Sequence, residues 1–361
     1  MILKISSENY SKQLKEKEEI FNSYFNKVTT KDIFPSSHHS FRHRCEFGVL
    51  NSDHGIKYSM IKDNERIEIE TYPICSKSIQ ELMKKLLKIV NQEQVLYKKL
   101  FQIEFQSSRS MEVMVSLIYH KELETSWVEK ANLIKDSLKC SVIGRSKKQK
   151  LIIGQDYVTE EYKSTNHSFK LKLYEQCFSQ TNPDVCDQII GWIEGIGKKN
   201  SDILELHCGL GTFTIPLSRL FNNVIATENS RPSLVALEKN IKLNKCKNIK
   251  NARLSGKETL EAYEERRAFR RLINKKIDLK EYNIKSIFVD PPREGIDQDT
   301  ISKISHFDEI IYISCGFESL KRDIDILNKT HEIKKVAMFD QFPYTDHIES
   351  GVILEKMTPT D

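Results

Sequence analysis

Hydrophobic positions in the first half of the chain either alternate in short stretches or recur at helical spacing. Short alternation is typical of strands, and longer segments with a period near 3.6 residues are typical of helices. The predicted strands are residues 41–50, 67–71, 101–105, 111–119 and 140–144. The predicted helices are residues 8–28, 77–100 and 121–138. With a further strand pair or hairpin at 151–175, this half is expected to be α+β.

The pattern changes from about residue 185, where short apolar runs alternate with helical segments. A helix predicted at 183–196 opens this part of the chain. The apolar runs that follow are residues 203–206, 224–227, 286–289, 309–313, 333–339 and 352–354. Short buried strands that alternate with helices predict a mostly parallel, doubly wound sheet. We therefore expect an α/β protein with an N-terminal α+β region at 1–175 and a second domain at 176–361.

Length and composition narrow the class of protein. The 361 residues correspond to about two domains at roughly 150 residues per domain. The net charge of +5 is mildly basic, which permits a polyanionic partner without requiring one. No apolar run approaches the roughly 18 residues of a membrane span, and the first ten residues carry no secretion signal. These features predict a cytoplasmic protein with no membrane partner.

The eight cysteines contain no C-x-x-C pair. This spacing argues against a zinc knuckle and against an iron–sulfur cluster, so we expect no metal. In a chain of this length without a signal sequence, the thiols are expected to be reduced. Any one of them could serve as a nucleophile.

A glycine-containing turn follows the first predicted strand of the second domain. Gly209 and Gly211 lie at this strand-to-helix turn, where glycine lets the backbone approach a ligand closely. The next strand ends at Glu228, 19 positions after Gly209, which is the spacing of an acid that binds ribose hydroxyls. This device occurs in sites for NAD and in sites for S-adenosylmethionine (SAM). Because the full G-x-G-x-x-G pattern is missing, the turn favours a nucleoside cofactor other than NAD.

The strand at 286–289 ends in Asp290-Pro291-Pro292-Arg293. The carboxylate lies at the carboxyl edge of the predicted sheet, where ligands of open α/β sheets bind, and the prolines make the loop rigid. In many nucleic-acid methyltransferases an aromatic residue follows such prolines and grips a flipped base. Arg293 stands in its place, which counts against methylation of an adenine amino group and makes Arg293 a candidate for substrate binding.

Cys315 follows the next strand, beside the same predicted crevice. A strand end followed by a helix N-terminus leaves the sulfur accessible and is expected to lower the pKa of the thiol. Glu349 directly precedes the last strand. Methylation of uracil at carbon-5 requires a thiolate that adds to carbon-6 and a base that then removes the carbon-5 proton. Cys315 and Glu349 fit these two roles.

These motifs resemble the bacterial tRNA (uracil-5-)-methyltransferases, which methylate uridine 54 in the T loop of tRNA. The resemblance covers most of the chain and rests on residues 41–47, 142–150, 154–158, 178–182, 205–213, 290–293, 313–315 and 339–351. It implies a Rossmann-like catalytic domain, Cys315 as nucleophile and Glu349 as base. It also implies that SAM is bound by Gln180, His207, Thr212, Glu228 and Asp290.

The sequence departs from the family pattern at four places. His207 stands where the family usually has Tyr, and Thr212 stands where it usually has Asn, so side-chain contacts of these two positions with SAM stay open. The family often has Cys-Asn-Pro where this chain has Cys315-Gly316-Phe317. Its Glu-Cys-Gly is replaced by Glu349-Ser350-Gly351. Both catalytic positions are present, which predicts an active enzyme.

RNA binding is expected mainly in the N-terminal region. Phe41, Arg42 and Arg44 offer the mixture of aromatic and basic side chains that holds unpaired nucleotides. The T arm of tRNA is the expected partner, together with other RNAs that carry a T-loop-like hairpin. A denser basic run precedes the Asp-Pro-Pro strand and is a second candidate for phosphate contacts. It consists of Arg266, Arg267, Arg270, Arg271, Lys275 and Lys276.

Two other functions remain open at this stage. The first is another nucleic-acid methyltransferase, acting on ribosomal RNA or on an amino group. Related ribosomal-RNA enzymes usually have an RNA-binding barrel and an iron–sulfur cysteine set, and the sequence shows neither. The second is a tRNA-binding chaperone that uses the fold without catalysis.

Overall fold

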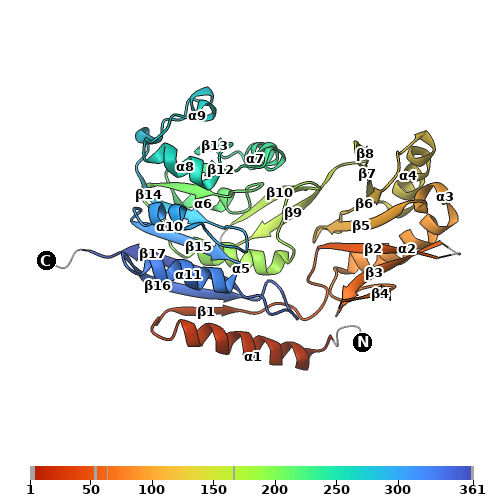
Figure 1. Ribbon diagram of the computed structural model, residues 1–361, viewed down its shortest axis with the longest axis horizontal. Coiled ribbons are helices and arrows are strands. Elements are labelled where there is room, and N and C mark those ends of the chain that lie inside the picture. Colours follow the sequence, from red (N-terminus) through yellow and green to blue (C-terminus); the bar gives the residue numbers. More distant parts are fainter. Residues whose placement is uncertain (1–4, 53–54, 63, 166, 359–361) are drawn as a thin grey trace.

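A computed structural model describes residues 5–52, 55–62, 64–165 and 167–358. Two lobes are visible in Figure 1, each built on one large sheet, with a two-stranded hairpin between them. The expected α/β class is confirmed. Among the described residues, no helix combines the length and the hydrophobicity needed to cross a bilayer.

The N-terminal lobe is a seven-stranded sheet in the order β4-β3-β2-β5-β6-β7-β8. Its strands are β2 (Arg44–Ser52), β3 (Gly55–Lys62), β4 (Glu65–Ile69), β5 (Leu100–Ser107), β6 (Val113–Tyr119), β7 (Ser141–Ser146) and β8 (Gln149–Ile153). Its helices are α2 (Lys77–Gln92), α3 (Gln94–Tyr97) and α4 (Thr125–Leu138). Buried side chains such as Met83 and Trp127 form one core with the inner face of the sheet. The helix predicted at 77–100 is therefore two helices and the start of a strand, and β3 was not predicted.

The C-terminal lobe is an eight-stranded sheet in the order β1-β16-β17-β15-β14-β11-β12-β13. Its strands are β1 (Lys31–Phe34), β11 (Asp202–Leu206), β12 (Val224–Thr227), β13 (Ile249–Ala252), β14 (Ile284–Val289), β15 (Glu309–Ser314), β16 (His331–Phe339) and β17 (Glu349–Lys356). Neighbouring strands are parallel except where β17 pairs with β15 and β16. The predicted doubly wound sheet is thus confirmed. The order of the strands reverses between β11 and β14, and ligands of such sheets bind at this reversal.

Helices cover both faces of the eight-stranded sheet (Figure 1). One face carries α5 (Pro183–Glu194), α6 (Thr214–Leu220) and α7 (Arg231–Leu243). The other face carries α1 (Ser7–Tyr24), α8 (Gly256–Tyr263), α9 (Arg270–Asn274), the 3-10 turn Leu279–Glu281, α10 (Gln298–Ile304) and α11 (Phe317–Leu327). Each layer buries an apolar face against the sheet, which is what positions the strand ends rigidly.

The first described helix and strand pack with the C-terminal lobe. Strand β1 pairs in parallel with β16, and Phe21 and Phe25 of α1 lie in the core of that lobe. The chain crosses to the N-terminal sheet only after Phe34. Residues 7–34 therefore lie with the second lobe, although they fall in the range 1–175 that the sequence assigned to the N-terminal region.

The predicted hairpin consists of β9 (Tyr157–Lys163) and β10 (Ser168–Tyr174). Strand β10 packs along α7, where the amide of Asn240 exchanges hydrogen bonds with the backbone of Lys172. The hairpin thus belongs to neither large sheet and lies between the two lobes (Figure 1).

Candidate active site at the carboxyl edge of the sheet

The strand register brings the predicted site residues to one edge of the eight-stranded sheet. Leu206 pairs with Val289 at the ends of β11 and β14. Ser314 pairs with Ser350 as the last pair between the antiparallel strands β15 and β17. One residue beyond these pairs lie His207 and Asp290 on one side, and Cys315 and Glu349 on the other. Residues separated by more than 140 positions in sequence therefore meet at the strand-order reversal.

The turn after β11 is shaped by residues with positive φ. His207, Gly209 and Gly211 have φ values of 58°, 56° and 101°. Glycine suits position 211 because other residues rarely adopt a φ of 101°, and a Cβ there would also lie 2.7 Å from Leu237 Cδ1 of α7. The amide of Gly209 donates to Glu228 Oε2 at 3.1 Å, and the amide of Ser230 donates to Oε1 at 2.7 Å. The Glu228 carboxylate is thus held beside the turn, as the sequence predicted.

Three other side chains of the predicted cofactor set approach the edge differently. Thr212 is partly buried on the turn, whereas His207 is exposed with its ring beside the start of α8. Gln180 is buried, and its Oε1 accepts a hydrogen bond of 2.8 Å from Nε2 of Gln341. The backbone amide of His43 donates to Thr181 at 2.7 Å, so the segment around Gln180 is held by the N-terminal lobe.

A buried carboxylate was missed in the sequence analysis. Glu205 in β11 is 1% exposed, and its Oε2 has no hydrogen-bond partner. Burial, with smaller effects of Asp290 and Glu228, raises the pKa of Glu205 to about 8. Burial also raises the pKa of Asp290 to about 7. The sequence signal that could have identified Glu205 is a charged residue inside an otherwise apolar, fully buried strand.

Cys315 is partly exposed at the end of β15 and precedes α11, whose N-cap is Gly316. The expectation that this position lowers the pKa of the thiol is wrong. Burial, and after it Glu349 and Asp290, raise the pKa of Cys315 to about 11, although Arg293 opposes them with its charge and a hydrogen bond. A helix N-terminus stabilises a thiolate only modestly, and here it is outweighed by burial and two carboxylates.

Glu349 is 2% exposed at the first position of β17. Burial and then Asp290 raise the pKa of this carboxyl well above its usual range, whereas Arg293 lowers it. The Arg293 guanidinium also lies 6.0 Å from the ring centre of Phe342. Arg293 is therefore the cation that faces both proposed catalytic groups.

The loop that carries Arg293 is fixed to the start of α11. Ser319 Oγ donates to the Arg293 carbonyl at 2.8 Å. A Cβ added to Gly316 would collide with the same carbonyl oxygen. The Asp-Pro-Pro loop and the residue after Cys315 thus touch, which explains locally why glycine stands at position 316.

The three N-terminal residues proposed to bind RNA are largely occupied by contacts within the protein. Phe41 is 3% exposed in the core of the N-terminal lobe, so its ring is not available to stack on a base. Arg42 Nε donates to the Arg44 carbonyl at 3.0 Å. Arg44 donates to the carbonyls of Glu175, at 3.1 Å, and of Cys177. Arg42 and Arg44 order the junction with residues 175–177, and Phe41 as a stacking residue is corrected.

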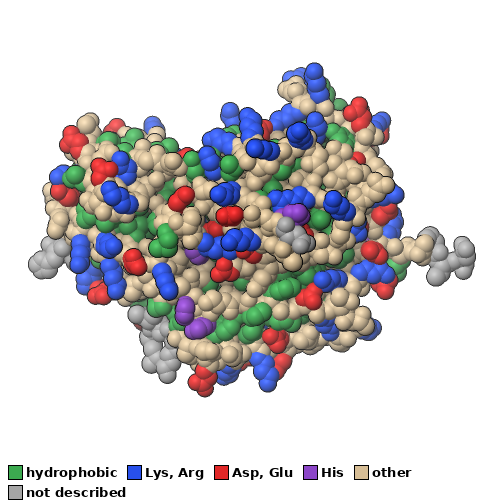
Figure 2. All heavy atoms as spheres, turned by 180° about the vertical axis from the view of Figure 1, so that it is seen from behind, with side chains coloured by type: hydrophobic (Ala, Val, Ile, Leu, Met, Phe, Trp, Pro, Cys, Tyr) green, Lys and Arg blue, Asp and Glu red, His purple; other side chains and the backbone are tan. Residues whose placement is uncertain are grey.

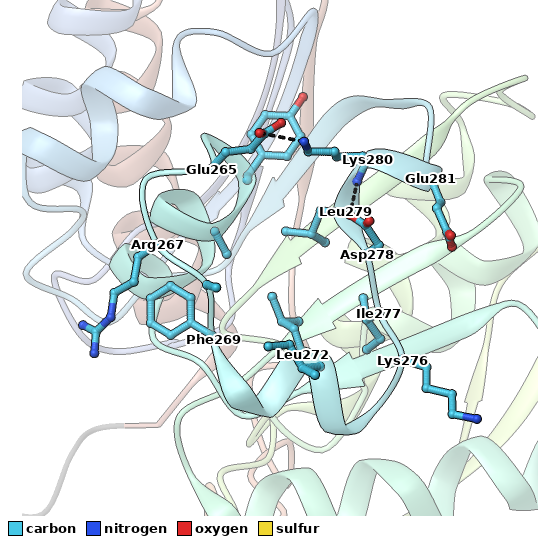
Figure 3. A pocket seen from close by; sticks show the side chains of 14 residues that line it. Glu265, Arg267, Phe269, Leu272, Lys276, Ile277, Asp278, Leu279, Lys280 and Glu281 are labelled. Atoms are coloured by element: carbon cyan, nitrogen blue, oxygen red, sulfur yellow. Dashed lines mark hydrogen bonds and ion pairs between the residues drawn. The ribbon is translucent and has the colours of Figure 1, made fainter.

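The basic run around α9 is partly neutralised. Arg266 pairs with Glu264 at 2.8 Å, Arg271 pairs with Glu258 at 3.1 Å, and Lys275 pairs with Glu238 at 2.6 Å. Arg267 and Lys276 project from opposite sides of the neighbouring cavity of about 510 Å³ (Figure 3). Together with Arg270, these two cations have no ion pair among the described residues. The run therefore offers fewer free charges than its sequence suggests.

A second surface with aromatic and basic side chains was not predicted. Phe101 and His120 stack with ring centres 3.9 Å apart. They line a cavity of about 760 Å³ together with Lys121, Lys147 and Lys148. Figure 2 shows the surface hollowed between the lobes, with Lys and Arg side chains along the edge of the C-terminal lobe.

Within the described ranges, no three His, Cys, Asp or Glu side chains are grouped so as to hold a metal ion.

Comparison with known proteins agrees with this arrangement. A tRNA/tmRNA (uracil-C(5))-methyltransferase of Saccharophagus degradans is 43% identical over 355 residues, which cover 96% of this chain and 97% of that protein. A protein of the same name from Neisseria meningitidis serogroup B is 41% identical over 360 residues, covering 96% and 99%.

A solved structure shares the fold. The crystal structure of Pyrococcus abyssi tRNA (uracil-54, C5)-methyltransferase in complex with S-adenosyl-L-homocysteine superposes with a TM-score of 0.71 at 18% identity, covering 96% of this chain and 83% of that chain. The family model described as tRNA (Uracil-5-)-methyltransferase matches residues 9–357. A match of this extent, together with relatives above 40% identity, means that the chain belongs to the tRNA (uracil-5-)-methyltransferase family.

Proposed function

We propose that this protein transfers a methyl group from SAM to carbon-5 of a uridine in tRNA, at position 54 of the T loop. The observation that carries the proposal is the meeting of Cys315 and Glu349 one residue beyond the last β15–β17 pair, next to Asp290. A nucleophile and a base at one end of a crevice are what methylation of a uracil ring needs. Neither group alone would suffice.

The residues at the strand-order reversal fit SAM. The molecule combines a nucleoside with a sulfonium and an ammonium group, and when bound it supplies an electrophilic methyl group. The glycine turn leaves room at Gly209, where an added Cβ would meet nothing. Glu228 is oriented for ribose hydroxyls, and the unpartnered buried oxygen of Glu205 suits a cationic ligand. Asp290, Gln180 and the turn at His207 and Thr212 complete the proposed set.

The proposed chemistry uses two groups of this chain. The Cys315 thiolate adds to carbon-6 of uracil, which makes carbon-5 nucleophilic enough to take the methyl group. Glu349 then accepts the proton from carbon-5, the carbon-5–carbon-6 double bond reforms, and the thiolate leaves carbon-6 with its bonding electrons. The raised pKa of Glu349 makes its carboxylate a stronger base, and Arg293 favours both anions.

RNA recognition is proposed to involve both lobes. The target base lies inside folded RNA and must be extruded to reach Cys315. The stacked pair Phe101–His120 in a lysine-lined cavity offers aromatic and cationic contacts, which suit an unpaired loop. This supports residues of the N-terminal region, within 1–175, as an RNA platform beside a catalytic domain at 176–361. The name of the relatives includes tmRNA, which is consistent with other RNAs that carry a T-loop-like hairpin.

The test is trapping of the covalent intermediate. In tRNA with 5-fluorouridine, fluorine replaces the proton that Glu349 must remove, so the adduct with Cys315 should persist in the presence of SAM. Cys315→Ala should form none. Cys246→Ala removes the other partly exposed thiol, and it should form as much adduct as the unaltered protein. Mapping the methylated nucleotide in ordinary tRNA should give position 54.

Two results would contradict this proposal and support another function. Methyl transfer without any adduct would point to another class of nucleic-acid methylation. Tight tRNA binding with no methyl transfer at saturating SAM would point to a chaperone.

A further inference from the structure

Helix α1 contacts the loop that leads into Glu349, although the two are more than 300 residues apart in sequence. Lys17 is 3% exposed, and its Nζ lies 2.8 Å from Asp340 Oδ1. The same ammonium donates to the Phe342 carbonyl at 3.0 Å. Asp340 is the first residue after β16, so this buried ion pair fixes the start of the loop 340–348.

The rest of the loop is held by the same helix. The amide of Tyr344 donates to Gln13 Oε1 at 3.0 Å, and the Tyr344 ring lies edge-on to Tyr10 with centres 6.2 Å apart. Phe342, whose carbonyl Lys17 binds, is the ring that faces Arg293. The loop then ends at Glu349. Helix α1 therefore determines where the loop 340–348 lies.

We propose that Lys17 is a positioning residue for the Glu349 carboxylate, acting through Asp340 and the Phe342 carbonyl. This inference rests on the proposed function. A buried ion pair fixes geometry strictly, because separating the charges leaves each one without solvent or partner. Asp340 is 1% exposed, and Lys17 is the cation paired with it among the described residues, with the Tyr10 hydroxyl as a second polar neighbour. Without the ammonium, the Asp340 carboxyl either takes up a proton or moves towards water, and in both cases the Phe342 carbonyl loses its donor, so the loop is no longer fixed at this point.

The role predicts an effect on one step of the reaction. Addition of Cys315 and methyl transfer do not require Glu349, whereas removal of the carbon-5 proton does. Lys17→Met should form the 5-fluorouridine adduct at a rate within about twofold of the unaltered protein. On ordinary tRNA its turnover should fall by about tenfold or more, because a small displacement of a catalytic group is costly. The covalent adduct, which the unaltered protein resolves quickly, should then accumulate.

Lys12→Met is the matched control, because Lys12 lies on the exposed side of the same helix. It should behave as the unaltered protein with both RNAs. Gln13→Leu removes the hydrogen bond to Tyr344 and leaves Lys17 in place. This variant should accumulate adduct on ordinary tRNA, but less of it than Lys17→Met. Thermal unfolding of all variants identifies any that do not fold.

The outcomes separate the two proposals. If the unaltered protein forms no adduct with 5-fluorouridine tRNA, both the proposed function and the positioning role are overturned. If it forms the adduct, equal losses of Lys17→Met with both RNAs overturn the positioning role alone, since a general structural defect would slow both. A Lys17→Met variant indistinguishable from Lys12→Met does the same. If Lys17→Met does not fold, an absence of adduct accumulation in folded Gln13→Leu also overturns it.

Discussion

Four carboxylates, of Glu205, Glu228, Asp290 and Glu349, lie at the carboxyl edge of the eight-stranded sheet. Burial raises the pKa of Glu205 to about 8 and that of Asp290 to about 7. Without a cation these two groups therefore bind protons near neutral pH. A cationic ligand in the crevice would favour their ionised forms, and by linkage their ionisation would favour the cation.

We predict that the affinity for SAM weakens as pH falls through the range from about 8 to about 7. Protonation removes negative charge that attracts the sulfonium, so binding at about pH 6 should be roughly tenfold weaker than at about pH 8.5. S-adenosylhomocysteine has the same ammonium and carboxylate but a neutral sulfur, and its affinity should change less. Titration calorimetry at both pH values measures the difference. Equal pH dependence of the two ligands would contradict the prediction, and Glu205→Gln should reduce the dependence for SAM.

Single residues were predicted from sequence where a motif marks a strand end. Glu228 lies where its spacing from Gly209 placed it, and Cys315 and Glu349 both lie at the edge. The pKa direction of Cys315 could not be predicted, because it depends on burial in the folded protein and on two carboxylates that come from other strands. The prediction that Phe41 stacks on a base was wrong for a related reason. A sequence pattern shows that an aromatic side chain is present, but only packing shows which way it faces.

At the scale of elements, the start of α11 and the Asp-Pro-Pro loop form one unit. Gly316→Ala would place a methyl group against the Arg293 carbonyl and 2.6 Å from Ser319 Oγ. The backbone of one or both segments must then shift, and Cys315 and Arg293 with them. We predict adduct formation slower by about tenfold or more, with the protein still folded, measured with 5-fluorouridine tRNA and by circular dichroism.

Gly191→Ala provides the comparison for this prediction. Gly191 lies inside α5, and an added Cβ there would meet nothing within 4 Å. Alanine is the better helix former by about 1 kcal/mol, so this variant should unfold at a higher temperature and form adduct normally. Unchanged adduct formation by Gly316→Ala would show that the two segments move independently.

Elements with a local signal were predicted, and elements that depend on distant partners were not. The strands β11, β12, β14 and β15 are short apolar runs and were found within a residue or two. Strand β1 is only four residues long and partly buried, and it exists because it pairs with β16, some 300 positions away. No local pattern carries that information, so the assignment of residues 7–34 to the second lobe had to come from the structure.

At the scale of the whole molecule, Arg109 joins the N-terminal sheet to three carboxylates outside it. Arg109 lies between β5 and β6 of the N-terminal sheet. Its guanidinium contacts Glu160 of the hairpin at 2.9 Å, and Asp184 and Asp187 of α5 at 3.0 and 2.5 Å. These carboxylates raise the pKa of Arg109 despite burial, so the charge is retained. The segment that holds Gln180 immediately precedes α5, which places this network next to the proposed SAM site.

Arg109→Leu should therefore uncouple the lobes as well as destabilise the protein. Removing the guanidinium leaves the Glu160 carboxylate, whose side chain is 2% exposed, with only the backbone amides of Arg109 and Glu161 as donors. Breaking a fully buried pair costs about 3–5 kcal/mol, and because Arg109 is 25% exposed we expect a loss towards the lower end of that range. We expect unfolding to begin at a lower urea concentration. The transitions followed by fluorescence and by circular dichroism should no longer coincide, because the lobes would unfold separately. Arg266→Leu removes a cation that is 61% exposed and should cost only about 0–1 kcal/mol. If Arg109→Leu keeps a single transition with a similarly small loss, the lobes are held together by their apolar contacts and by the hydrogen bonds of His43 and Gln106, not by this charge network.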